Sequence, residues 1–128
     1  MSIEYVLDAS AVLALIFAER GHQTVEPLLP VAAIGAVNAA EVLTRLIRLG
    51  ATAPDAAKAL DELHLRVRPF GLEDALAAAR LDAVSRACGL SLGDRACLAL
   101  AQRLGVPAVT ADRNWRTPKL GVRVRLLR

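Results

Sequence analysis

Four carboxylates of the 128-residue chain stand where an expected strand or helix begins or ends. Two follow short apolar runs, and two come three residues after a residue that can cap a helix; they are Asp8, Asp112, Glu41 and Asp94. The ends of parallel strands and the starts of the following helices gather on one side of a sheet, where open α/β folds bind their ligands. We therefore expect the four side chains to converge.

A cluster of carboxylates calls for a cation, because neighbouring carboxylates otherwise repel and raise each other's pKa. Ligands that offer only oxygen favour Mg²⁺, with Mn²⁺ as a substitute, and neither His22 nor His64 falls in the pattern. Water bound to such an ion loses its proton more readily, beside a phosphate that the same ion polarises. The cluster thus predicts phosphodiester hydrolysis.

Three polar residues are expected to support the carboxylates: Ser10, Asn38 and Thr110. Ser10 and Thr110 each stand two residues from an acid, where a hydroxyl can orient the carboxylate or hold a bound water. Structural alternatives remain open at all these positions. Asn38-x-x-Glu41 and Ser91-x-x-Asp94 resemble capping boxes, and the other two acids can serve turns or caps.

The charge of the chain is divided unevenly along its length. Residues 1–112 carry a net charge of −3, whereas residues 113–128 carry +6 and contain no acid. This asymmetry indicates a polyanion near the C-terminus, and a solvated surface is the alternative. The expected RNA phosphate contacts are Arg113, Arg116, Arg123 and Arg125. Trp115 is expected to be a core anchor rather than a base-stacking platform.

Short apolar runs alternate with helical patterns along the chain. The expected strands cover residues 3–7, 31–35, 66–68, 107–109 and 122–127. The expected helices cover 10–17, 22–29, 38–48, 54–63, 72–87 and 91–104, with Ser10, Asn38 and Ser91 as capping residues. This alternation predicts an α/β fold, a three-layer α/β/α sandwich with a central, mainly parallel sheet of four to five short strands, built as one domain over residues 1–128.

The composition excludes several classes of protein. Hydrophobic residues make up 55% of the chain, which excludes an intrinsically disordered protein. The longest apolar run ends at Glu19, short of a membrane span, and residues 1–4 lack the basic start of a signal peptide. We therefore expect a cytoplasmic protein with no membrane association, in which Cys88 and Cys97 are buried thiols rather than a disulfide.

Four segments together resemble the PIN domain, and more closely the bacterial VapC-type toxin ribonucleases. They are Val6-Leu7-Asp8-Ala9-Ser10, Val37-Asn38-Ala39-Ala40-Glu41-Val42, Ser91-Leu92-Gly93-Asp94-Arg95-Ala96-Cys97-Leu98 and Thr110-Ala111-Asp112-Arg113-Asn114-Trp115. Each segment alone is weak evidence. Their order and spacing, which span nearly the whole chain, make the resemblance specific.

The resemblance implies a magnesium-dependent endoribonuclease, the toxin of a VapBC-type toxin–antitoxin pair. Its catalytic and metal-binding residues would be Asp8, Glu41, Asp94 and Asp112, with Ser10 and Thr110 in support. It also implies a homodimer and a small antitoxin protein that occupies the active-site groove. Some PIN domains carry a further acid after the last of these residues, where this chain has Arg113 and Asn114, so we expect one ordered Mg²⁺.

Two other functions fit parts of the pattern. A PIN-like module that binds RNA or a protein without cutting would need no carboxylate cluster. A metal-dependent phosphatase acting on a small phosphoester would also suit an Asp after the first strand. In the haloacid-dehalogenase phosphatases, however, a second Asp stands where this chain has Ser10.

Overall fold

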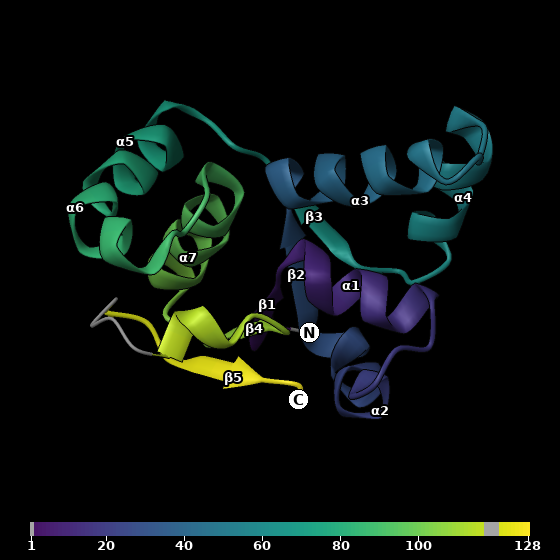
Figure 1. The fold of residues 1–128 in the computed structure, drawn as a ribbon, viewed down its shortest axis with the longest axis horizontal. Coiled ribbons are helices and arrows are strands. Elements are labelled where there is room, and N and C mark those ends of the chain that lie inside the picture. The colour runs from purple at the N-terminus through teal and green to yellow at the C-terminus, as the bar shows by residue number, and fades with distance from the viewer. Residues whose placement is uncertain (1, 117–120) are drawn as a thin grey trace.

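The computed structural model describes residues 2–116 and 121–128 (Figure 1). These residues form one sheet of five parallel strands in the order β3-β2-β1-β4-β5. The strands are β1 Tyr5–Leu7, β2 Ala32–Gly35, β3 Arg66–Arg68, β4 Ala108–Thr110 and β5 Val124–Leu126. The parallel sheet confirms the predicted fold class, and β1 at its centre ends next to β2 and β4.

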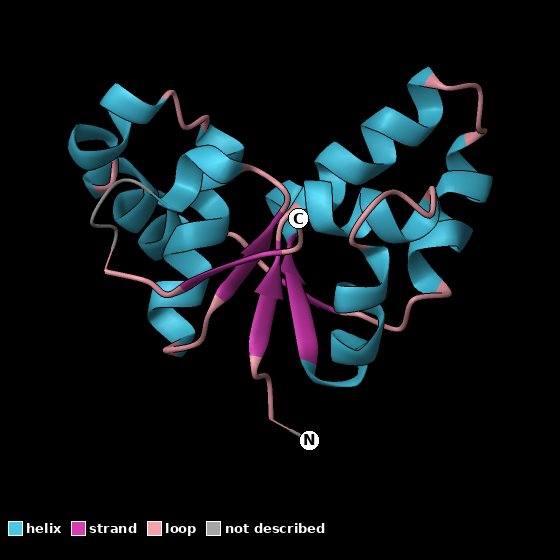
Figure 2. Ribbon diagram, turned by 60° about the horizontal axis from the view of Figure 1, so that its bottom comes forward, coloured by secondary structure: helices cyan, strands magenta, loops and turns pink. Residues whose placement is uncertain are grey.

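Helices cover both faces of the sheet, in two groups that spread apart beyond the carboxyl ends of the strands (Figure 2). The first group contains α1 Ala9–Ile16, α2 His22–Val25, α3 Ala36–Arg48 and α4 Ala53–Asp61, with the 3₁₀ segment η1 Glu26–Val31. The second contains α5 Leu72–Arg80, α6 Asp82–Ser85, η2 Arg86–Cys88 and α7 Leu92–Leu104. Another 3₁₀ turn, η3 Arg113–Arg116, follows β4. The arrangement is the predicted three-layer sandwich.

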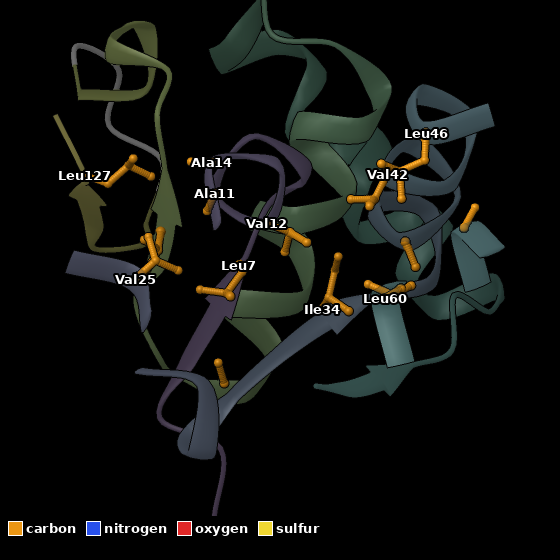
Figure 3. Close-up of a cluster of buried hydrophobic side chains, with 14 residues drawn as sticks. Leu7, Ala11, Val12, Ala14, Val25, Ile34, Val42, Leu46, Leu60 and Leu127 are labelled. Carbon is orange, nitrogen blue, oxygen red and sulfur yellow. The ribbon is translucent and has the colours of Figure 1, made fainter. Parts of the chain in front are cut away.

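The sheet separates two apolar cores because successive side chains of a strand point to opposite faces. Leu7 lies in the core shared with α1, α3 and α4, together with Val12 and Ile34 (Figure 3). Its neighbour Val6 lies in the second core, with Leu98 of α7. Val6 and Leu7 are both fully buried, as expected for the central strand of a parallel sheet.

Two predicted helix starts are wrong, and both errors concern site residues. Helix α1 begins one residue early, because Asp8 rather than Ser10 caps it by accepting a hydrogen bond from the Ala11 amide. Helix α3 begins at Ala36 with Gly35 as its N-cap, so Asn38 stands inside the first turn and does not cap it. The side chain of Asn38 is buried and has other partners, described below.

Other boundaries agree more closely. Ser91 and Asp94 form the predicted capping box of α7, and Gly105 ends that helix in the left-handed region with a φ of 67°. The predicted helix over 72–87 is instead divided among α5, α6 and η2, and the one over 22–29 becomes α2 and η1. Pro27 and Pro30 favour the 3₁₀ form there because they lack the amide hydrogen that an α-helix uses.

Within the described ranges, none of the helices has the length and apolar character needed to cross a bilayer. Both cysteines are free, and Cys97 is completely buried while Cys88 is partly exposed. Trp115 is 1% exposed and packs in the core shared by Val6 and Leu98, which confirms the prediction of a core anchor.

Candidate active site

Asp8 lies at the carboxyl end of β1, at the centre of the sheet, and is 4% exposed. Its Oδ1 accepts hydrogen bonds from the Ala11 amide at 2.8 Å and the Ser10 hydroxyl at 2.7 Å, and its Oδ2 accepts one from the Thr110 hydroxyl. Burial raises the pKa of Asp8 to about 6, although these three hydrogen bonds lower it. A buried carboxylate is thus held in one orientation.

The two hydroxyls also fix the loop that carries Asp112. Ser10 Oγ accepts a hydrogen bond from the Ala111 amide at 2.9 Å, and Thr110 Oγ1 accepts one from the Asp112 amide at 3.0 Å. Each hydroxyl therefore donates to Asp8 and accepts from the backbone beyond β4. The two side chains thus join the ends of the neighbouring strands β1 and β4. This geometry agrees with the supporting role predicted for Ser10 and Thr110.

Asn38 holds Glu41 against helix α7. Its amide nitrogen donates to Glu41 Oε1 at 2.8 Å and to the Gly93 carbonyl at 3.0 Å, and the residue is only 1% exposed. A Cβ added at Gly93 would lie 2.7 Å from the carboxyl carbon of Glu41, closer than real Cβ atoms come. Gly93 therefore leaves the space that the Glu41 carboxylate occupies.

Asp94 stands in the first turn of α7. Its Oδ2 accepts a hydrogen bond from the Ser91 amide at 2.9 Å, and its own amide donates to Ser91 Oγ at 3.2 Å. The capping box and the candidate site therefore share this residue, so the two interpretations of Asp94 are compatible. Asp112 is held in a similar way, since its Oδ1 accepts from the Asn114 amide at 2.9 Å.

The pKa values of Asp8, Glu41 and Asp94 are coupled through the charge of Asp94 and its neighbours. Burial is the main cause that raises the pKa of Glu41, and the charge of Asp94 raises it further. The charge of Asp94 also adds to the raised pKa of Asp8. Burial raises the pKa of Asp94 itself, with a contribution from the charge of Asp112. Asp94 thus lies within electrostatic reach of Asp8, Glu41 and Asp112, which come from three other segments of the chain.

The donor set suits a hydrated hard cation. No three acidic, histidine or cysteine side chains in residues 2–116 and 121–128 converge closely enough to hold an ion between them. Mg²⁺, however, keeps several waters and needs only one or two direct carboxylates. Three of the four acids have a raised pKa caused by burial and like charge, and a divalent cation would relieve both effects. The residues therefore fit Mg²⁺.

The predicted phosphate contacts are scattered. Arg113 is exposed and directly follows Asp112. Arg123 lines a small hollow at the end of α7 that is remote from Asp94, and Arg125 lies over the ring of Tyr5, at the opposite end of β1 from Asp8. The structure does not bring Arg123 and Arg125 to the carboxylates. The side chain of Arg116 lies outside the described part of the chain.

Sequence reasoning missed two groups of residues near the acids. Gly93 was not singled out, although a glycine one position before Asp94 and two positions after the expected cap Ser91 was a visible signal. The second group is Arg45 and Arg48, the basic residues in the last turn of α3. They line an open hollow of about 460 Å³ on α3 together with Glu41.

Cys97 is a buried residue of α7, three positions after Asp94. Burial raises the pKa of its thiol, and the charges of Asp8, Asp94 and Glu41 raise it further. The thiol therefore stays protonated, and it packs as a small apolar group, as predicted from the sequence.

A family model of the PIN domain matches residues 5–119. No curated protein matches the sequence. The fold is similar to VapBC2 from Rickettsia felis, solved bound to a DNA fragment from their promoter, with a TM-score of 0.75 and 15% identity over 98% of each chain.

Two further structures are similar over the same extent. DNA-bound VapBC from Salmonella typhimurium has a TM-score of 0.74 and 17% identity, covering 98% of this chain and 99% of that one. A toxin–antitoxin complex from Klebsiella pneumoniae has a TM-score of 0.75 and 17% identity over 98% of each chain. These similarities establish the fold, and the family match spans β1 through η3. The chain belongs to the PIN domain family.

Proposed function

We propose that the protein is a magnesium-dependent endoribonuclease and the toxin of a VapBC-type toxin–antitoxin pair. The observation that carries the proposal is that Asp94, in the first turn of α7, lies within electrostatic reach of three other acids. They are Asp8 at the end of β1, Glu41 on α3 and Asp112 after β4. Membership of the PIN domain family also supports a nuclease.

Each acid has a role in this mechanism. When Mg²⁺ is bound, it supplies charge neutralisation at the phosphate and a more acidic water. Asp8, held by Ser10 and Thr110, would present a fixed carboxylate to the ion, and Asp94 and Glu41 would hold or orient it. Asp112 completes the anionic pocket. No histidine takes part in the described site, so proton transfer involves the carboxylates and water.

The test is cleavage of purified RNA by the purified protein. We expect discrete fragments with Mg²⁺ or Mn²⁺ and none with a chelator. Asp94→Asn should lower the rate at least about a hundredfold, because it removes charge from the centre of the cluster. The asparagine oxygen can still accept the Ser91 amide, so the helix start is preserved. Exposed Asp61→Asn is the matched control, and its rate should be unchanged.

Three outcomes separate the alternatives. RNA binding without cutting, unaffected by Mg²⁺ and by Asp94→Asn, would contradict the nuclease and favour a non-catalytic binding module. Hydrolysis of a small phosphoester such as p-nitrophenyl phosphate, without RNA cleavage, would indicate a phosphatase. Cutting of DNA but not RNA would leave the metal mechanism in place and contradict only the proposed substrate.

The proposed partner is a small antitoxin protein that occupies the active-site groove. The proposal is supported by structural neighbours that are themselves VapBC or toxin–antitoxin complexes. Co-expression with the product of a neighbouring gene should inhibit cleavage and give a stable complex on gel filtration. Cleavage that continues in the presence of every such product would contradict the antitoxin assignment.

We also propose that the protein acts as a cytoplasmic homodimer and that residues 1–128 work as one domain. Exposed leucines on α5 support a dimer, since Leu72 is 86% exposed and Leu76 is 52% exposed. Apolar side chains exposed together commonly mark an interface. Light scattering should give twice the mass of 13.6 kDa for the protein and a monomer for Leu76→Glu. A monomeric parent protein at micromolar concentration would contradict the dimer.

A further inference from the structure

Two hollows adjoin the acidic site and meet at one side chain. The first, of about 460 Å³, lies on α3 and is lined by Val37, Ala40, Glu41, Thr44, Arg45 and Arg48. The second, of about 320 Å³, lies between α1 and α3 and is lined by Ser10, Leu13, Phe17, Glu19 and Arg45. Arg45 is common to both. Arg45 therefore stands between two neighbouring hollows, which we together call the α1–α3 groove. Glu41 lines the first hollow and Ser10 lines the second.

Arg45 carries an uncompensated charge in this groove. Glu41 stands four residues before Arg45 on the same helix, a spacing at which glutamate and arginine commonly pair. Here the Glu41 carboxylate turns instead to Asn38 and Gly93. Within residues 2–116 and 121–128, salt bridges at 4.0 Å or less join other pairs of residues, and none includes Arg45 or Arg48.

The position of these arginines is explained only in part by the helix. Cations are favoured in the last turn of an α-helix, which suits Arg45 and Arg48. That preference accounts for their presence in α3 but not for their place beside two hollows that lead to the acids. The walls of the groove carry Arg45 and Arg48, and the one acid on the wall away from the site, Glu19, pairs with Arg128 at 3.8 Å. The groove thus offers cations beside the carboxylates of the site, as a polyanion held by its backbone and cut at one phosphate requires.

We propose that the α1–α3 groove holds the backbone of single-stranded RNA, and that Arg45, assisted by Arg48, contacts the phosphates beside the one that is cut. This inference rests on the proposed ribonuclease function and names how its substrate lies. It moves the phosphate contacts from the C-terminal arginines, of which Arg123 and Arg125 lie away from the carboxylates, to helix α3. Arg45 is a positioning residue, because it acts on a neighbouring phosphate and not on the reacting atoms.

The experiment measures the salt dependence of RNA binding. A fluorescent single-stranded RNA of mixed sequence is titrated with the Asp94→Asn protein, which leaves the RNA intact, at several salt concentrations. Each lost phosphate contact lowers the slope of log affinity against log salt by about 0.7 for a single strand. We expect that decrease on adding Arg45→Ala, about twice as much on adding Arg48→Ala as well, and restoration by Arg45→Lys.

The matched control is Arg80→Ala, which removes an exposed arginine from the last turn of α5. It should change neither the affinity nor the slope. In the cleavage-competent protein, Arg45→Ala should raise KM about tenfold with kcat within about twofold, because one exposed phosphate contact is lost. A merely structural role for Arg45 at the end of α3 would change neither the salt slope nor KM selectively.

The outcomes distinguish this proposal from the function on which it rests. Cleavage that proceeds normally, with a slope and KM unchanged by Arg45→Ala, would overturn the proposal alone and assign the groove to a protein partner. A changed slope in a protein that does not cut RNA would support the proposal while contradicting the ribonuclease. Absence of RNA binding in every variant would overturn both.

Discussion

The carboxylate of Glu41 rests against the backbone of Gly93, so the space that a side chain would take on α7 is filled by an acid from α3. Asn38 secures this contact from the other side, since its amide nitrogen bonds both residues. Helices α3 and α7, which belong to different helical groups, can thus pack closely at the site because Gly93 has no side chain. The contact explains why the helix start that carries Asp94 contains a glycine.

Gly93→Ala should therefore impair cleavage without unfolding the protein. The added methyl group would displace the Glu41 carboxylate, whereas alanine is a better helix former than glycine by about 1 kcal/mol. We expect the rate to fall about ten- to a hundredfold with Tm unchanged or higher. Adding Glu41→Asp, which shortens the acid by one methylene, should recover part of the loss. A drop in Tm that accounts for the lost activity would contradict this explanation.

Thr110→Val should weaken the site by releasing Asp8. Valine has nearly the same shape as threonine, but it neither donates to Asp8 Oδ2 nor accepts from the Asp112 amide. Loss of a group that orients a metal ligand typically lowers metal affinity or activity about ten- to a hundredfold. The Mg²⁺ dependence of cleavage checks this, and Thr110→Ser should restore it. Equal activity of the valine and serine variants would show that the hydroxyl is dispensable.

Much of the fold and the site was predictable because local signals decide them. Strand positions, the capping box of α7 and the four acids follow from patterns a few residues long. The support that Asn38 gives to Glu41 was predicted, but its bond to the Gly93 carbonyl and the role of Gly93 were not, because they depend on a contact between α3 and α7, 55 residues apart in the chain. Asn38 resembles a cap in sequence, yet tertiary packing gives its side chain two better partners and moves the helix start to Ala36.

The C-terminal arginines illustrate the same limit. Their charge is visible in the sequence, but their distance from Asp8 depends on where β5 joins the sheet. Because β5 is the edge strand beside β4, Arg125 reaches back to Tyr5 at the start of β1. Charge asymmetry along a sequence therefore indicated a polyanion without locating the surface that would bind it.

Trp115 should report on folding and not on RNA. It is the only tryptophan and is 1% exposed, and its indole nitrogen has no hydrogen-bond partner within the described residues. Trp115→Phe should therefore keep activity, whereas Trp115→Ala should cost about 3–5 kcal/mol of stability through the cavity it leaves. In the parent protein, saturating RNA should leave acrylamide quenching of the fluorescence unchanged. Protection by RNA would contradict the role of a core anchor.

Mg²⁺ should stabilise the folded protein even if the protein does not cleave RNA. An ion that binds the native state alone raises the free energy of unfolding by about 2.7 kcal/mol at a concentration of 100 times its Kd. We expect Tm to rise with Mg²⁺ at pH 7.5 in the parent protein and in Asp61→Asn, and much less in Asp94→Asn. Ca²⁺ offers a comparison, because it binds oxygen ligands with looser geometry. An identical rise in Asp94→Asn would place the ion elsewhere.

Without metal, the stability of the protein should fall as the pH rises through the range between about 4 and 6. The native state keeps the proton of Asp8 up to its pKa of about 6, whereas the unfolded chain releases it near 3.8, so the unfolded state binds fewer protons in between. Asp8 alone then lowers the free energy of unfolding by about 3 kcal/mol across this range. Glu41 and Asp94, whose pKa values are also raised, act in the same direction.

Urea denaturation in the presence of a chelator, at pH 4.5 and pH 7.5, checks this expectation. The decrease should be clear in the parent protein and in Asp61→Asn, and smaller in Asp8→Asn, because asparagine carries no proton to lose. Asparagine can still accept the Ala11 amide, so helix α1 keeps its cap. Mg²⁺ should restore the stability lost at pH 7.5, since it compensates the charge that burial makes costly. Stability that rises from pH 4.5 to pH 7.5 without metal would mean that the folded protein stabilises the ionised carboxylate of Asp8. The site would then be preorganised without its cation.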